Sequence, residues 1–525
     1  MKKRKAAEDG TPEPCRDRLS SLPDDLIGRI LSLLPTPQAV LTSQLSRRWR
    51  RAWAHIAALN LSAVRDCARR GRGPRLSDLA RGALLRFPTP GIPSVSVEIN
   101  RSVYTADEWY RQAMERAVGS VRVASPCTLN GLELPPCARA EALAVRSPRT
   151  VLTLPDPAAA APFGRLAELS LSLVQLGGGA ARPLGEFLAS CCPRLRTLRL
   201  CSVRGPALRW LVLRTDVLEV LDLSNVDDLT SLDVAATNLR CLSVRSCFRS
   251  PTGGDGEVAV SAPRIEAVRW HRSYPEQLIF RSDLASARQL GGPLRLPALG
   301  RRDQSDAPYT LQLLHACSQA HHLDLELVMP DETTLLNWLG PAEHGACEDL
   351  IRRVPQLPNA SALSLKIRWG FGGGVAPSLA SLLSRTPALT RLRVDASPYC
   401  FAVFRSQEGD EPPPRPRGWQ RWTSGVRAGD DGLRLDSLRE VAVVGLKGED
   451  PEEYRVLKLL LGSASPSLER VSLTFRDDAA ASIVDEIATD VPTRFSMAAG
   501  RWKCCPPRVL TWIKQKLPTQ ACEQV

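Results

Sequence analysis

Histidine and cysteine are the residues best suited to metal binding or nucleophilic catalysis, and neither is spaced for such chemistry here. The six histidines stand at positions 55, 271, 315, 321, 322 and 344. His321 and His322 fall on a predicted strand, where successive side chains point to opposite faces, so the pair would not share a metal ion. The cysteines include the adjacent pairs Cys191–Cys192 and Cys504–Cys505, but no two CxxC motifs. We therefore predict no metal site.

Motifs for phosphate binding and covalent catalysis are also absent from the sequence. GxGxxG, GxxxxGK[ST], HExxH and GxSxG do not occur. The stretch "GFGGGVAPS" from Gly370 lacks the lysine and the spacing of a phosphate loop. We interpret it as a turn before a helix that contains Pro377. A nucleophilic cysteine needs a lowered thiol pKa and a nearby base, and no motif indicates either. The sequence therefore predicts a non-catalytic chain without a cofactor.

The composition is that of a globular protein large enough for two or more folding units. The chain has 525 residues, of which 43% are hydrophobic and 24% charged. It contains no uninterrupted run of about 18 apolar residues, so we expect neither a transmembrane helix nor a membrane partner. The start "MKKRKAAEDG" has no apolar segment of a secretion signal. The 15 cysteines are therefore expected to be reduced, in the nucleus and/or the cytoplasm.

Basic residues give the chain a formal net charge of +13. They are spread along the sequence without the interleaved aromatic residues that nucleic-acid sites use, so we do not expect nucleic acid as the principal partner. The run Lys2, Lys3, Arg4 and Lys5 is a nuclear-import candidate, and a disordered basic tail is the alternative.

Two or three short helices are predicted near the N-terminus, in the segment "LPDDLIGRILSLLPTPQAVLTSQLSRRWRRAW" that begins at Leu22. Their apolar residues form two rows on the first helix (Leu26, Ile30, Leu33; Ile27, Leu31, Leu34) and one on the second (Leu45, Trp49, Trp53, Ile56). A unit of fewer than about 40 residues rarely buries so much apolar surface by itself. Part of this surface must therefore dock onto a partner or onto the rest of the chain.

A degenerate repeat of the form LxxLxL occupies the middle of the chain. Copies begin at Leu166, Leu195, Leu218, Leu239 and Ile265, separated by 29, 23, 21 and 26 residues. Leucine-rich repeats have periods of about 20–29 residues. Second short strands are predicted at "LRWLVL" and "LTSLDV", and further copies at "HHLDLEL", "ASALSLKI", "LTRLRV", "LREVAVV" and "LERVSL". The pattern predicts a solenoid in which each repeat buries its leucines against its neighbours.

Two stretches rich in glycine, proline and charge interrupt the repeats. We predict long loops from Pro275 to Pro308 and from Tyr399 to Asp431. Ahead of the repeats, "SVSVEIN" alternates as a strand does, and "ADEWYRQAMERAV" is typical of an amphipathic helix.

The N-terminal segment closely resembles the F-box, the helical module through which F-box proteins bind a Skp-type adaptor. The resemblance rests on "LPDDLIGRILSLLP", the "TS" break and "LSRRWRRAW". The stretch "LREVAVVGLKGEDPEEYRVLKLLLGSASPSLERVSLTF" resembles the FBD-type ending of plant F-box/leucine-rich-repeat proteins. The resemblance implies adaptor-contacting residues at Leu22, Pro23, Leu26, Ile30, Leu33, Leu34, Leu45, Trp49 and Trp53.

The resulting hypothesis is an α/β chain with an N-terminal F-box followed by an irregular, horseshoe-shaped leucine-rich-repeat solenoid. Its regions are a basic tail (1–16), the F-box (17–58), a linker with first mixed repeats (59–160), the repeat region (161–397), a Pro/Arg-rich insertion (398–434) and an FBD-like region (435–525). The resemblance implies a non-catalytic substrate receptor of a cullin-RING ubiquitin ligase, which binds the adaptor, through it cullin, and a protein substrate. The alternatives are a ubiquitin-independent interaction scaffold and a basic nuclear protein that contacts nucleic acid.

Overall fold

The computed structural model of the chain contains two compact units. The first comprises 1–178 and 190–193, and the second 179–189 and 194–525. The structure describes residues 21–34, 38–39, 42, 46–52, 56, 58–62, 82, 84–85, 91–98, 108–126, 128, 131–134, 139–155, 163–177, 183–248, 256–300, 307–329, 348–368, 375–396, 433–448, 451–462, 467–477, 479, 484–485, 487, 489, 491, 500–505 and 508–514. Within these ranges, no helix has the length and apolar character needed to span a bilayer.

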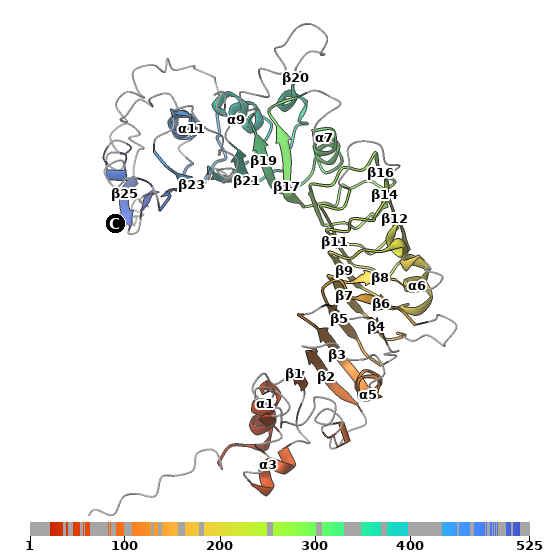
Figure 1. The fold of residues 1–525 in the computed structure, drawn as a ribbon. Helices are drawn as coiled ribbons and strands as arrows, with labels where there is room; N and C mark the ends of the chain where they lie inside the picture. Colours follow the sequence, from red (N-terminus) through yellow and green to blue (C-terminus); the bar gives the residue numbers. More distant parts are fainter. Residues whose placement is uncertain are drawn as a thin grey trace, which may run out of the picture. The chain divides into compact units, whose positions relative to one another are not determined.

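The first unit consists of short helices and two ladders of parallel strands (Figure 1). Its helices are α1 (Asp24–Leu33), α3 (Arg47–Arg51) and α5 (Glu108–Arg116). One ladder runs β1 (Ala58–Ser62), β2 (Ile92–Glu98), β3 (Ala117–Ala124), β5 (Ala142–Arg146) and β7 (Glu168–Ser172). The other runs β4 (Leu132–Glu133), β6 (Val151–Thr153) and β8 (Gln175–Leu176). Helix α1 packs against β1, which ties the N-terminal helices to the sheet.

The second unit extends the same plan over more strands. Its main parallel ladder is β9 (Thr197–Cys201), β11 (Val220–Ser224), β13 (Cys241–Arg245), β15 (Ala267–His271), β17 (Gln289–Pro297), β19 (His322–Val328), β21 (Ala362–Arg368), β22 (Arg391–Asp395), β23 (Glu440–Leu446) and β24 (Arg470–Phe475). The ladder then ends in antiparallel strands, with β26 (Val509–Lys514) pairing with β24 and β25 (Gly500–Cys505) pairing with β26.

A second sheet and several short helices complete this unit. The sheet is β10 (Trp210–Arg214), β12 (Ser231–Ala235), β14 (Glu257–Ser261) and β16 (Gln277–Phe280). The helices are η3 (Pro206–Leu208), α7 (Ala307–Ala316), η4 (Leu350–Arg353), α9 (Val375–Leu383) and α11 (Pro451–Gly462), and β18 (Leu299–Gly300) pairs with β20 (Glu348–Asp349). Helix α6 (Leu184–Cys191) contains the division between the units. Figure 1 shows α7, α9 and α11 on one face of the main ladder.

Alternating leucines explain both the strands and their register. In the LxxLxL copy at Leu218, residues Leu218, Leu221 and Leu223 are all buried, while Asp222 between the last two is half-buried. Leu221 lies opposite Leu198 on β9 and Leu242 on β13, so the buried side chains form continuous rows across the ladder. The strands predicted from the repeat copies are confirmed, as are the half-way strands β10 and β12, the helix α5 and the mixed α/β class.

The long loop predicted from Pro275 to Pro308 is wrong. The segment forms β16, β17 and β18, and α7 begins at its end. The prediction failed because β17 is irregular: its register with β19 shifts between Leu290 and Leu294. Gly292 lies between them with a φ of +122°, a conformation that glycine adopts without strain. The intervening Gly-Gly-Pro therefore disturbs the alternation of one strand without ending it. The other predicted loop, Tyr399–Asp431, lies outside the described residues.

Burial makes several cysteines poor nucleophiles. Burial raises the pKa of Cys192 to about 12, with a smaller contribution from Cys191, and it raises the pKa of Cys317 to about 12 and that of Cys247 to about 11. At pH 8 these thiols stay protonated, and the thiolate is the reactive form. We expect iodoacetamide to modify the exposed Cys201 of the native protein quickly, and the three buried cysteines only after unfolding. Peptide mapping by mass spectrometry measures this difference; equal native-state rates at Cys201 and Cys317 would contradict it.

Candidate functional site

The two apolar rows of α1 differ sharply in exposure. Ile27 and Leu31 are 0% and 1% exposed and form part of the core of the first unit. Leu26, Ile30 and Leu33 are 41%, 37% and 82% exposed, and the three together are called the α1 apolar row below. Flanking this row, Leu22 and Leu34 are half-buried and Pro23 is exposed. Helix α1 therefore uses one row for its own packing and presents the other to solvent.

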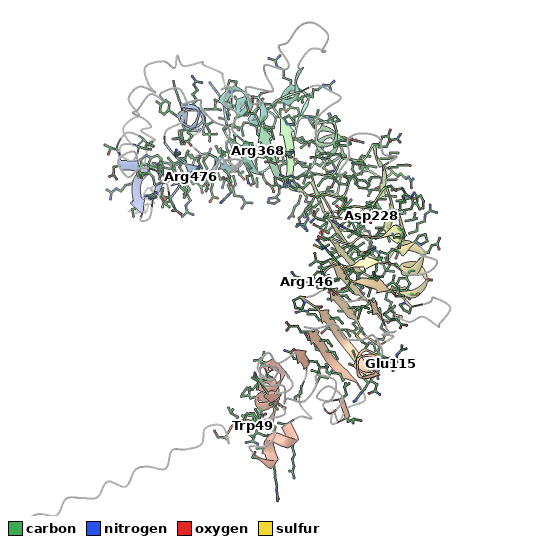
Figure 2. The ribbon with its side chains drawn as sticks, viewed as in Figure 1. Trp49, Glu115, Arg146, Asp228, Arg368 and Arg476 are labelled. Atoms are coloured by element: carbon green, nitrogen blue, oxygen red, sulfur yellow. The ribbon has the colours of Figure 1, made fainter. Side chains whose placement is uncertain are left out.

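Helix α3 packs inward and is held to α1 by polar contacts. Its Trp49, labelled in Figure 2, is 8% exposed. The backbone N–H of Trp49 donates to the hydroxyl of the N-cap residue Ser46 at 3.3 Å. Arg48 Nε donates to Asp24 Oδ1 at 2.7 Å, and the Arg48 guanidinium also reaches the carbonyl of Leu22. An ion pair this exposed contributes about 0–1 kcal/mol, so its main effect is to orient α3 against the start of α1.

Not all predicted adaptor-contacting residues can be located. The structure describes Leu22, Pro23, Leu26, Ile30, Leu33, Leu34 and Trp49, whereas Leu45 and Trp53 lie outside the described residues. The nuclear-import candidates Lys2, Lys3, Arg4 and Lys5 also lie outside them, as does most of the predicted 398–434 insertion. Among the described residues of this set, only the α1 apolar row consists of large, exposed hydrophobic side chains. A contiguous row of this kind is typical of a protein-binding surface.

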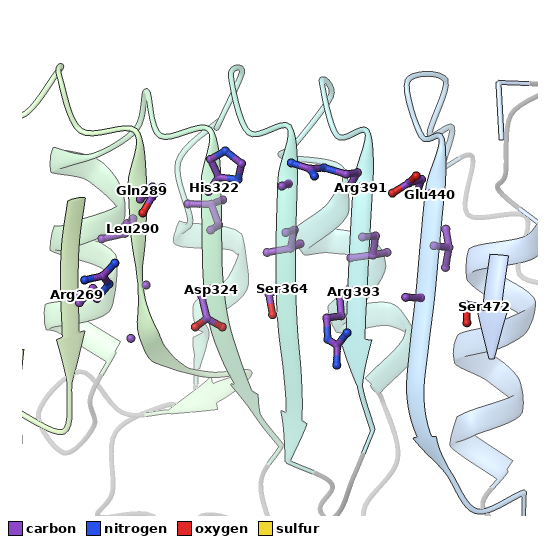
Figure 3. A pocket seen from close by; sticks show the side chains of 18 of the residues that line it. Arg269, Gln289, Leu290, His322, Asp324, Ser364, Arg391, Arg393, Glu440 and Ser472 are labelled. Atoms are coloured by element: carbon purple, nitrogen blue, oxygen red, sulfur yellow. The ribbon is translucent and has the colours of Figure 1, made fainter. Parts of the chain in front are cut away.

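A second candidate site lies on the solvent face of the main ladder in the second unit. A pocket of about 750 Å³ extends over strands β15, β17, β19, β21, β22, β23, β24 and β26. Figure 3 shows its side chains on the face opposite the helices, arranged in rows across the strands. Its lining includes four arginines, two acidic residues and one histidine, namely Arg269, Arg391, Arg393, Arg470, Asp324, Glu440 and His322. They alternate with buried residues along each strand, as the pleat requires.

The bulge of β17 shapes one end of this pocket. Gly291 lines the pocket next to Asp324, and a Cβ atom at Gly291 would lie 2.8 Å from Asp324 Cβ. A side chain at position 291 would therefore collide with the acidic residue. Burial raises the pKa of the Asp324 carboxyl above its ordinary value, although hydrogen bonds from the Gly292 amide and from Ser364 partly oppose this rise.

This pocket is a site that the sequence did not reveal. The arginines belong to repeat strands such as "LTRLRV", where they look like ordinary solvent-facing residues. The one available signal is the Gly-Gly pair inside β17, because a glycine within a strand often marks a close approach or a bulge. In the part of the chain that the structure describes, no three acidic, histidine or cysteine side chains gather as a metal site would require.

Comparisons with known proteins give one domain match and several similar proteins. Residues 19–56 match the F-box domain model. An F-box/FBD/LRR-repeat protein of Arabidopsis thaliana is 27% identical over 259 residues, which are 48% of this chain and 54% of that protein. An Arabidopsis F-box/LRR-repeat protein is 30% identical over 193 residues, covering 36% of this chain and 41% of the relative. Another F-box/FBD/LRR-repeat protein reaches 56% identity over 46 residues, 9% of this chain and 10% of its own length. The chain thus spans about half the length, or less, of the relatives it matches.

Proposed function

We propose that this chain, which carries an F-box domain and is similar to plant-type F-box/leucine-rich-repeat proteins with an FBD region, is a substrate receptor of an SCF-type ubiquitin ligase. In this proposal the F-box binds a Skp-type adaptor and, through it, a cullin. The repeat strands bind a protein substrate. The proposal includes a horseshoe-shaped solenoid for the repeats and a location in the nucleus and/or the cytoplasm.

The observation that carries this proposal is the α1 apolar row. It lies inside residues 19–56, where the F-box model matches, and its side chains are not used by the core of the first unit. Removing such exposed apolar side chains from water supplies roughly 25 cal/mol for each Å² buried. Trp49, by contrast, is 8% exposed and offers little surface to a partner.

A receptor of this kind needs no catalytic residue. A receptor that holds a substrate lysine near an activated ubiquitin raises the effective concentration of that lysine. Other subunits then form the bond between ubiquitin and the lysine. The proposal therefore assigns the chain two binding surfaces and no covalent chemistry.

Adaptor capture tests the proposal. The full chain is co-expressed with a Skp-type adaptor, and complex formation is measured by size-exclusion chromatography for the native sequence and for Leu33→Asp. We expect the native chain to co-elute with the adaptor and Leu33→Asp to elute alone, because a carboxylate at the most exposed member of the α1 apolar row would be desolvated in the interface.

Two results would overturn the receptor proposal. The first is a native chain that is folded but holds no adaptor, which favours the scaffold alternative. The second is capture by Leu33→Asp at native strength, which would mean that the adaptor binds elsewhere.

A further inference from the structure

Arginines on the sheets of the second unit fall into a paired and an unpaired group. Arg245 on β13 illustrates the first group, since its guanidinium lies 3.2 Å from Asp222 Oδ1 on the neighbouring strand. Within the described part of the chain, no acidic side chain lies within ion-pair distance of Arg391, Arg393 or Arg470, and these three form no side-chain hydrogen bond. All three line the pocket on the main ladder. The pocket thus collects guanidinium groups whose donors are available to a ligand.

The unpaired arginines are close enough to act on one ligand. Arg391 and Arg393 lie two residues apart on β22, so their Cα atoms are separated by about 7 Å and their side chains share the solvent face. Arg470 lies two strands away on β24, about 10 Å across the ladder. Each guanidinium carries five N–H donors in a planar fork that matches a carboxylate or phosphate group.

Short side chains leave room between these arginines. In the row that contains Arg393, the neighbours on either side are Ser364 and Ala442, and Ser472 follows on β24. Figure 3 labels four members of this row, which are Asp324 on β19, Ser364 on β21, Arg393 on β22 and Ser472 on β24. Alanine and serine side chains are too short to fill the space between the long arginine side chains. A ligand group resting there would meet arginine donors and two serine hydroxyls.

Acidic residues in the same pocket limit what it can hold. Glu440 occupies the register position between Arg391 and Arg470. Asp324 lies two strands from Arg393 in the other direction. Two carboxylates among four arginines disfavour the closely spaced charges of a nucleic-acid backbone, whereas one anionic side chain can approach the arginines alone. The pocket volume of about 750 Å³ suits a segment of a few residues.

We infer that Arg391, Arg393 and Arg470 bind an anionic side chain on an extended segment of the protein substrate. A carboxylate and a phosphorylated side chain offer the same chemistry to the three guanidinium groups. The inference takes from the proposed function only the statement that the segment belongs to a ligase substrate. The binding itself is a property of the pocket.

Fluorescence anisotropy of the full chain tests the inference. The probe is a fluorescein-labelled Ser-Glu-Ser-Glu-Ser-Glu peptide, compared with the same peptide carrying phosphoserine at the glutamate positions and with an all-serine peptide. We expect both anionic peptides to bind and the serine peptide not to bind. Arg393→Glu should weaken the binding of the anionic peptides by about tenfold or more, because it removes a charged hydrogen bond. Glu440→Gln should strengthen it, because a like charge is removed.

Arg439→Glu is the matched control. Arg439 directly precedes β23, the strand that contains Glu440, and it does not line the pocket. Its side chain is largely exposed and lies 3.8 Å from the carboxylate of Glu469. We expect it to bind the peptides within about twofold of the native chain, since an exposed pair contributes little. Thermal unfolding of each variant verifies that the pocket is folded.

Several outcomes would overturn the inference. They are no binding of either anionic peptide, equal losses in Arg393→Glu and Arg439→Glu, weaker binding in Glu440→Gln, or tighter binding of a short single-stranded DNA than of either peptide. Adaptor capture by the same preparations separates the two proposals. Peptide binding without adaptor capture would contradict the receptor function but not the anion-binding pocket. Adaptor capture without peptide binding would contradict the anion-binding pocket alone.

Discussion

Replacing Leu26, Ile30 and Leu33 together by alanine is expected to weaken binding of a Skp-type adaptor at least about 1000-fold. Truncation of a central interface side chain costs about 2 kcal/mol or more, and 1.4 kcal/mol corresponds to a tenfold change in affinity. Three such losses exceed 1000-fold even when they are not fully additive. Isothermal titration of purified chain with adaptor measures the change.

The folded state of this triple variant should be almost unaffected. The three side chains are 41%, 37% and 82% exposed, and exposed substitutions usually change the free energy of unfolding by less than about 0.5 kcal/mol each. Ile27→Ala is the contrasting variant, because Ile27 is fully buried and its truncation should cost about 2–5 kcal/mol. If the triple variant unfolds as easily as Ile27→Ala, the α1 apolar row belongs to the core of this chain and the receptor proposal loses its main support.

Glu326→Ala is expected to destabilise the second unit strongly. The Glu326 side chain on β19 is 4% exposed, and its carboxylate lies 3.3 Å from Arg295 Nε on β17 and 3.6 Å from Arg368 Nε on β21 (Figure 2 labels Arg368). Both arginines are themselves mostly buried. Removing one partner of a buried ionic cluster costs about 3–5 kcal/mol, since the remaining charges stay desolvated and lose the attraction of the carboxylate. Urea denaturation followed by circular dichroism measures this loss.

Two further variants sharpen the Glu326 experiment. Glu257→Ala on β14 is the matched control, because Glu257 is exposed and should change the free energy of unfolding by less than about 0.5 kcal/mol. The triple replacement Arg295→Met, Glu326→Leu and Arg368→Met removes all three charges, and such replacements are often neutral or stabilising. A Glu326→Ala protein that unfolds at the native urea concentration would show that the cluster contributes nothing to the fold.

Leucine periodicity made most of the ladder predictable from the sequence. Each LxxLxL copy became a strand because its alternate leucines must all face one core, and that requirement fixes the register as well. Strand β17 escaped this reasoning. Its bulge at Gly291 and Gly292 breaks the alternation locally, yet the pairing with β19 resumes at Leu294 after the irregularity. The pairing with β15 is confined to Gln289–Gly291.

Both candidate sites depend on information that one sequence does not contain. Helical spacing separates two apolar rows on α1, but it cannot say that Ile27 faces the core and Ile30 faces solvent, because that choice is made by the strand β1 against which α1 packs. Likewise, Arg245 and Arg393 each follow a buried residue on a repeat strand. Only the strand register shows that the neighbours of Arg393 are Ser364 and Ala442, with no acidic partner beside it.

The antiparallel strands at the end of the main ladder bear on how the protein avoids self-association. A parallel strand such as β24 would otherwise present a free row of N–H and C=O groups, to which a second molecule can add a strand. Strand β26 covers that row, and among the described strands β25 is the outermost one in this part of the sheet. The exposed residues Arg501 and Lys503 on β25 add like charges that repel another copy. The terminal hairpin thus protects a long, leucine-rich sheet from edge-to-edge aggregation.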